Sequence, residues 1–271
     1  MLISIAGLNS QLGLRLTDTT RTQQLEQLQR EPQNSRAVEA FREGIGSITT
    51  PKELTDNFEV YSFVMRAFDL EDQIFGRGLM RKMLESDPND ETSLVNRLTD
   101  PRFKEIHDAL GFAKDDIAKP DFNSIIWQEI IISKYFDTAF ENGVEEQNPT
   151  VASVLKFRRE APELNNWFQV MRDPELSSFF RTALGLPDQL AGIDIDLQKK
   201  AFESKLDLST LNDPDVQDRL INRYMAVSDI QNAPSAVSST ALSVLQSTGG
   251  LGVIISLNVP PVSVSASSLF R

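Results

Sequence analysis

The chain has 271 residues, which is long enough for one large domain or two small ones with a sizeable buried core. Its net charge of −12 disfavours binding to nucleic acids and to anionic membrane surfaces, because no basic stripe interrupts the acidic sequence. Cysteine is absent and histidine occurs once, which excludes disulfides, thiolate metal sites, cysteine nucleophiles and metal sites built from histidines alone.

The N-terminal segment, residues 1–32, predicts a polar helix. Leucine recurs every four residues from Leu8 to Leu16 within a helix expected over 8–30, and Pro32 ends the pattern. So narrow an apolar stripe buries little by itself, and we expect this helix to pack on the body of the protein or on a partner. The start of the chain lacks the basic segment of a Sec signal, and no run approaches the ~20 apolar residues of a membrane span.

Residues 33–228 predict a helical body, because apolar residues recur at helical spacing between capping signals. Ser35 is the expected N-cap of a helix over 34–48, and Thr50 with Glu53 predicts a capping box that starts the next helix. Further helices are expected over 54–68, 71–84, 101–110, 149–171, 174–184, 194–206 and 213–227.

Two stretches of this body need a decision. The β-branched residues of 124–132 would suit a strand, but the helical period continues for about 17 residues, longer than a usual strand. A buried helix is therefore favoured there. Pro162 falls inside the helix expected over 149–171 and should break or kink it, because proline removes a backbone donor.

The C-terminal segment, 229–271, differs from the rest of the chain. Ser, Ala and Val dominate it, and no charged residue occurs between Ile230 and Arg271. An uncharged apolar segment is a liability when it is loose, so it either docks on something or is flexible in the free protein. Residues 253–257 could form a short strand.

Three helix starts share one device. Asp100, Asp173 and Asp213 each precede a proline, which places Asp at the N-cap and Pro at the first helical position. The order of the surrounding motifs also repeats, which suggests two units over roughly 54–113 and 172–228; the alternative is that Asp-Pro is only a common helix opener. The chain is thus expected to be all-α, a multi-helix orthogonal array with a possible internal duplication and a Ser/Ala/Val-rich C-terminal segment.

No motif predicts a catalytic, cofactor-binding or metal-binding residue, and we expect no cofactor. His107 lies one residue off the apolar stripe of its helix without a well-placed carboxylate, so we expect a surface or half-buried structural histidine. Residues 87–91 have the residue types of a calcium loop but not its ligand spacing or central glycine. Glycines at 76–78 and 249–252 lack the spacing of nucleotide-binding loops. The sequence therefore predicts a protein that is not an enzyme.

Several motifs resemble those of a known family. They are Phe41-Arg42-Glu43, Ala67-Phe68-Asp69-Leu70, Asn96-Arg97-Leu98-Thr99-Asp100-Pro101-Arg102-Phe103 and Ala109-Leu110-Gly111-Phe112. They are similar to the hallmarks of the alphaproteobacterial family of domains of unknown function numbered 1217, best over 36–113, with departures at Asp69, Phe103 and Leu110. Members occur among flagellar genes, so the resemblance implies a flagellum-associated protein without known enzymatic activity, and it carries over no functional residue.

From this resemblance we expect a structural or assembly protein of the flagellum that acts through protein–protein contacts. Its partners would be proteins, flagellar components among them, and it would reside in the cytoplasm or be exported to the flagellum. The expected contact surfaces are the helix over 8–30 and the segment after 230. The alternative is a general helical adaptor or chaperone module unrelated to the flagellum.

Overall fold

The computed structural model of the protein describes residues 2–113 and 119–232, and every regular element in these two ranges is helical. The first helices are α1 (Ser10–Arg30), α2 (Pro32–Ile45), α3 (Pro51–Asp56), α4 (Phe58–Ala67), η1 (Glu71–Gln73), α5 (Arg77–Leu84), α6 (Leu94–Arg97) and α7 (Pro101–Leu110). They are followed by α8 (Ile125–Glu145), α9 (Pro149–Glu160), η2 (Ala161–Glu163), α10 (Trp167–Arg172), α11 (Pro174–Leu184), η3 (Asp188–Gly192), α12 (Ile195–Glu203), η4 (Leu208–Asn212) and α13 (Pro214–Gln231). The all-α prediction is confirmed.

Local capping chemistry starts and stops most of these helices as predicted. Thr50 and Glu53 form a reciprocal capping box at the start of α3. At the Asp-Pro starts, the carboxylates of Asp100, Asp173 and Asp213 each accept the backbone N–H two residues later. Helices α7 and α11 end at glycines with positive φ, where a residue without a Cβ is least strained.

Three predicted helix boundaries were wrong. In two of them, at Pro32 and Asn57, a residue expected to end or continue one helix begins or caps the next helix. Pro32 occupies the first position of α2, which places Ser35 inside that helix, where its hydroxyl donates to the carbonyl of Gln29. Asn57 interrupts the helix expected over 54–68 by accepting the N–H of Val60 and capping α4. The helix expected over 71–84 is η1 followed by α5.

The two undecided stretches are resolved as helices. Residues 125–145 are the single helix α8, so a strand over 124–132 is excluded. The helix expected over 149–171 is split around Pro162, which lies in η2 between α9 and α10. The C-terminal segment was expected either to dock or to be flexible, and a strand was suggested over 253–257. The described residues include only the first few of this segment, 229–232, where α13 ends, so these expectations concern residues outside the described ranges.

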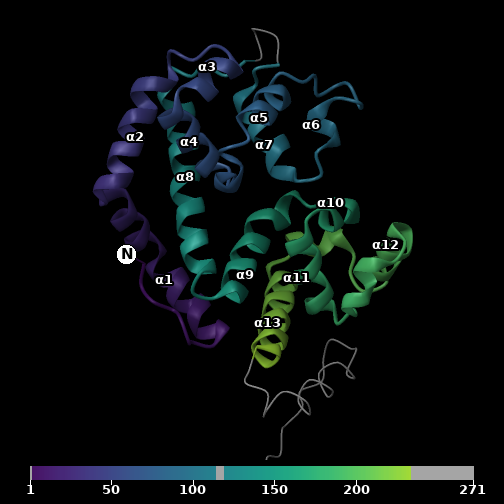
Figure 1. Cartoon of the computed structure of the whole chain (residues 1–271). Helices are drawn as coiled ribbons and strands as arrows, with labels where there is room; N and C mark the ends of the chain where they lie inside the picture. Colours follow the sequence, from purple (N-terminus) through teal and green to yellow (C-terminus); the bar gives the residue numbers. More distant parts are fainter. Residues whose placement is uncertain (1, 114–118, 233–271) are drawn as a thin grey trace, which may run out of the picture.

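Helix α8 runs through the middle of the molecule and contacts helices on both sides of it (Figure 1). It packs against α1 and α4 on one side and against α9 on the other. Helix α1 lies on α8, α9, α13 and α2, which buries the polar side chains of Ser10, Thr17 and Gln24. Ser10 donates to the Asp229 carboxylate of α13, so the polar face of α1 is used within the protein.

Two similar stacks of aromatic rings form the core on either side of α8. In the first, Phe63 of α4 stacks on Phe41 of α2 at 4.5 Å and on Tyr135 of α8 at 4.3 Å. In the second, Phe179 of α11 stacks on Phe157 of α9 at 4.3 Å and lies 4.5 Å from Tyr224 of α13. Rings at these separations add to the energy of apolar burial.

The backbone repeats along with the rings. Helices α4 and α11 both end in a left-handed residue, Asp69 with φ 55° and Gly185 with φ 68°. The next residue in each case, Leu70 or Leu186, donates to the carbonyl five residues back at 2.8 Å. A short 3-10 helix and then a longer α-helix follow in both places. The two corresponding parts begin at α2 and α9, earlier in the chain than the repeat units expected over 54–113 and 172–228. That the two parts arose by internal duplication stays a prediction.

Candidate functional site

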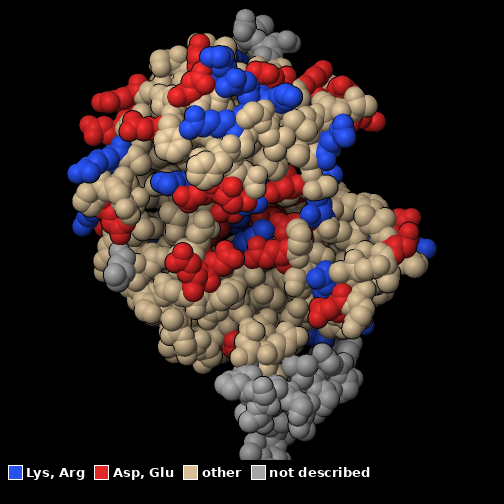
Figure 2. All heavy atoms as spheres, in the orientation of Figure 1, with Lys and Arg blue, Asp and Glu red and all other residues tan. Residues whose placement is uncertain are grey.

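A cleft of about 1140 Å³ lies between the two sides of the molecule and is lined mainly by charged residues (Figure 2). One face of α8 forms part of its wall, because the side chains from Lys134 to Glu145 that line it recur at helical spacing. The N-terminal ends of α7 and α11 also open onto it. Its charged residues are Asp69, Asp100, Arg102, Lys104, Glu105, Asp108, Lys134, Glu141, Glu145, Lys156, Arg159, Glu160, Glu163, Arg172, Asp173 and Glu175.

Two of the three predicted Asp-Pro caps lie in this cleft, and each binds a cation in addition to capping its helix. Asp173 accepts the N–H groups of Glu175 and Leu176 with one oxygen, and its other oxygen lies 2.8 Å from the Lys156 ammonium. Asp100 similarly caps α7 and lies 2.7 Å from the Arg102 guanidinium. A carboxylate that serves both purposes fixes the cation relative to the helix start.

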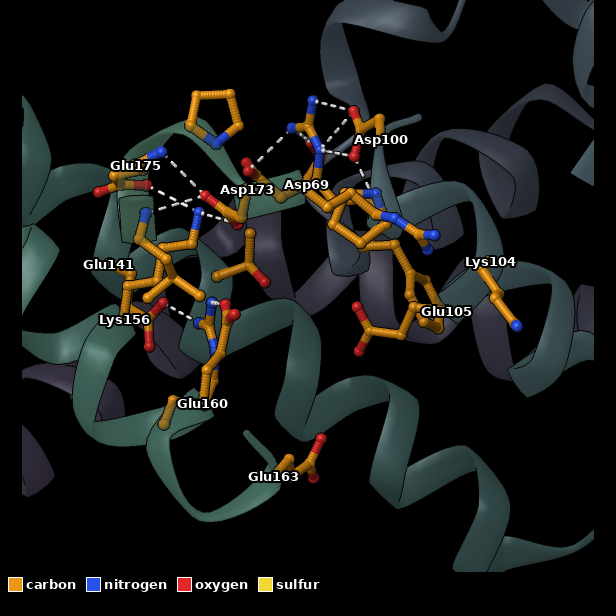
Figure 3. Close-up of a pocket in the computed structure, with 18 of the residues that line it drawn as sticks. Asp69, Asp100, Lys104, Glu105, Glu141, Lys156, Glu160, Glu163, Asp173 and Glu175 are labelled. Carbon is orange, nitrogen blue, oxygen red and sulfur yellow. Dashed lines mark hydrogen bonds and ion pairs between the residues drawn. The ribbon is translucent and has the colours of Figure 1, made fainter. Parts of the chain in front are cut away.

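Four of the six cations in the cleft, Arg102, Lys134, Lys156 and Arg159, are held by carboxylates of the protein itself. Lys156 lies between Asp173 and Glu175, 2.8 Å from each (Figure 3). Burial opposes the charge of Lys156, but the hydrogen bonds to these two carboxylates outweigh it, and the pKa of Lys156 is raised. Hydrogen bonding to Asp100 likewise raises the pKa of Arg102. These two cations therefore remain charged across the physiological pH range.

Carboxylates outnumber cations in the cleft by ten to six. Burial, together with the nearby Glu175 and Asp69, raises the pKa of Glu145. Burial also raises the pKa of Glu160, and the charge of Asp173 adds to the effect. A raised carboxyl pKa is what an acid catalyst needs, but it also arises wherever carboxylates crowd together in a partly desolvated space. The cleft is therefore an acidic site whose charges are only partly balanced.

The raised pKa of Glu160 predicts a pH-dependent stability difference. Between its ordinary pKa of 4.5 and the raised value, the folded state binds more protons than the unfolded state, so this group makes the protein less stable as pH rises. Glu160→Gln removes that loss. Relative to the wild type, the variant should gain stability as pH rises from about 4.5 to 7, measured by urea unfolding at several pH values.

Asp207→Asn supplies a control of opposite sign. A hydrogen bond from the Ser209 backbone lowers the pKa of Asp207, so its contribution to stability is present above the ordinary pKa of 3.8 and is lost as pH falls. This variant should therefore lose stability relative to the wild type as pH rises to about 3.8, and should change little relative to it from about pH 4.5 to 7. Parallel pH profiles for the wild type and Glu160→Gln would contradict the prediction for Glu160.

His107 does not line the cleft, and its predicted exposure was wrong. The side chain is fully buried, and its Nε2 lies 3.0 Å from the carbonyl oxygen of Ser86. Helices α5 and α6 both pack on α7 and so cover the side of α7 next to its apolar stripe. In residues 87–91, Asp87 accepts the N–H of Asn89 and forms a turn. Within residues 2–113 and 119–232, no group of three or more acidic or histidine side chains is placed to hold a metal ion.

Comparison with known proteins identifies the family. A family model described as a protein of unknown function, DUF1217, matches residues 67–217. The chain belongs to the DUF1217 family. All residues that line the cleft fall within the matched segment, so the cleft is part of the region by which the family is defined. No curated protein matches this DUF1217 chain.

A solved structure shares the fold. The X-ray crystal structure of a protein from Agrobacterium tumefaciens, a structural genomics target, superposes with a TM-score of 0.72 at 24% sequence identity. The match covers 86% of this chain and 98% of the other. This likeness supports the helical architecture. Among the described residues, no helix is long and apolar enough to cross a membrane.

Proposed function

We propose that this DUF1217 protein is a non-enzymatic structural or assembly protein of the bacterial flagellum, and that it acts by binding a basic segment of a partner protein in its cleft. The surplus of carboxylates in the cleft is the observation that carries the proposal. The flagellar context comes from the resemblance of its motifs to a family found among flagellar genes.

The pairing pattern inside the cleft favours a basic partner over an acidic one. Arg102, Lys156 and Arg159 each have a carboxylate of the protein within hydrogen-bonding distance. An incoming anion would have to displace these carboxylates; Lys104 and Arg172, which form no ion pair among the described residues, are both exposed. An incoming lysine or arginine would instead meet Glu145 and Glu163, which form no ion pair with any residue the structure describes. Complementary charge of this kind selects partners and speeds their association.

Deleting the gene and scoring swimming and filament formation tests the flagellar role. We expect impaired swimming that is restored by the wild-type gene. Normal motility and normal filaments in the deletion strain would contradict the role. Capture of unrelated proteins in preference to flagellar export substrates would support the alternative of a general adaptor or chaperone.

A variant of the cleft tests the mode of binding. Glu145→Gln combined with Glu163→Gln removes two carboxylates that form no ion pair within residues 2–113 and 119–232, so the fold should be retained. We expect capture of the flagellar partner to weaken about tenfold, which corresponds to about 1.4 kcal/mol. Glu39→Gln combined with Glu59→Gln removes the same charge from exposed positions on α2 and α4, outside the cleft, and should leave capture unchanged. Equal capture by both variants would contradict binding in the cleft.

A further inference from the structure

Two exposed apolar patches lie on the two sides of the molecule, away from the cleft. The α5 patch consists of Phe58, Phe75, Arg77, Leu79 and Lys82. Phe75 is 93% exposed and Phe58 is 51% exposed, and the Arg77 guanidinium lies 5.2 Å from the centre of the Phe58 ring. Soluble proteins seldom leave several large apolar side chains together in water unless a partner covers them.

The α12 patch consists of Ile193, Asp194, Ile195, Asp196 and Leu197, at the start of α12. All five residues are exposed, and the three apolar side chains are 45%, 51% and 52% exposed. Apolar and acidic residues alternate here over the N-cap and first turn of α12, where the Asp194 carboxylate accepts the N–H groups of Asp196 and Leu197. The α12 patch therefore presents both an apolar contact surface and negative charge.

The two patches occupy corresponding places in the repeated architecture. Apart from Phe58, each follows a left-handed residue and a short 3-10 helix with a buried anchor, Ile74 directly after the first 3-10 helix and Leu190 within the second. The sequence Asp-Gln precedes both anchors, at 72–73 and at 188–189. Corresponding sites thus share a backbone arrangement but carry different side chains.

Those side chains carry opposite charge. Arg77 and Lys82 of the α5 patch form no ion pair with any residue that the structure describes, and the same holds for Asp194 and Asp196 of the α12 patch. Basic side chains gather over α3 and α5, and acidic ones lie at the outer end of α12 (Figure 2).

We propose that the α5 patch of one copy docks on the α12 patch of a second copy. Each surface offers three large apolar side chains, and their charges attract, so apolar burial and electrostatics both favour the pairing. The contact joins two different surfaces, so it is head-to-tail and leaves a free patch at each end. Repetition of the contact produces a ring if the rotation closes and a filament if it does not.

This self-association uses surfaces outside the cleft and goes beyond the proposed function. Failure of the two patches to associate would leave binding of a basic segment in the cleft untouched. Normal motility of a deletion strain would likewise leave the self-association untouched. The two proposals can therefore fail separately.

Mass measurement on the full chain tests the contact, by analytical ultracentrifugation over a range of concentrations. One variant blocks the α5 patch with Phe75→Ser and Arg77→Asp, and a second blocks the α12 patch with Ile195→Ser and Asp196→Lys. Leu12→Ser, at a 50% exposed position on α1, is the matched control. Circular dichroism confirms that each variant is folded.

The wild type and the control should show a mass that rises with concentration above the 30.4 kDa of one chain. Each blocked variant alone should remain monomeric, because it retains only one of the two complementary patches. An equimolar mixture of the two blocked variants should form a one-to-one dimer, because each supplies the patch that the other lacks.

A monomeric wild type at all concentrations, a blocked variant that associates as the wild type does, or a mixture that stays monomeric would each overturn the proposal. Charge reversal provides a second set of variants that leaves the apolar residues in place. Arg77→Asp and Asp196→Lys should each weaken association when present alone, and neither removes a helix cap. The two changes combined in one chain should restore it.

Discussion

Replacing Phe157 with alanine is expected to lower the free energy of unfolding by about 3 to 5 kcal/mol, the usual cost of emptying a core site of this size. Phe157 is fully buried, with its ring stacked 4.3 Å from that of Phe179 and at 5.6 Å edge-on to that of Phe180. The substitution removes these contacts and leaves a cavity between α9 and α11. Urea unfolding followed by circular dichroism measures the loss.

Phe168→Ala is the matched control, because it makes the same chemical change at a site that is 44% exposed. Its cost should be below about 1 kcal/mol, since little burial is lost. A loss for Phe157→Ala no larger than that for Phe168→Ala would show that the second aromatic stack is not a close-packed core.

The second large effect is expected at Asp173. Asp173→Ala should cost about 2 to 4 kcal/mol, because it removes a helix cap worth ~1 kcal/mol and one of two carboxylates that balance a largely buried lysine. Lys156 has 22% of its side chain exposed, so water compensates its charge only in part. Urea unfolding of the variant and the wild type at neutral pH measures the difference.

Two further substitutions separate these contributions. Asp213→Ala removes the same Asp-Pro cap from α13, where no cation within the described residues lies against the carboxylate, and it should cost about 1 kcal/mol. Asp173→Asn keeps a side chain that can cap α11 but removes the charge that faces Lys156. Equal losses for Asp173→Ala and Asp213→Ala would contradict a stabilising role for the ion pair.

Sequence predicted those parts of the fold that depend on near neighbours. The capping box at Thr50 and the Asp-Pro starts each need only residues a few positions apart, so their chemistry is visible in the chain. The periodicity of residues 125–145 likewise extended far enough to distinguish a helix from a strand. Where one residue suits two adjacent roles, as Pro32 and Asn57 do, the boundary was misplaced.

The cleft could not be predicted in the same way, because its pairs join residues distant in sequence. Lys156 of α9 meets Asp173 at the start of α11, and Arg102 of α7 meets Asp69 beyond the end of α4, so each pair forms only when separate helices of one side pack together. The burial of His107 has the same origin, since it depends on α5 and α6 lying over α7. The Asp-Pro motif did identify Asp100 and Asp173, but as caps; their second role required their partners to be located.

Helix α8 also has a consequence for synthesis of the protein. The first aromatic stack includes Tyr135, so the core built by α2 and α4 remains open until that part of α8 has left the ribosome. The same helix then offers a ready surface on which α9 can pack as it emerges. The first aromatic stack therefore closes once α8 is made, whereas the second waits for Tyr224 of α13.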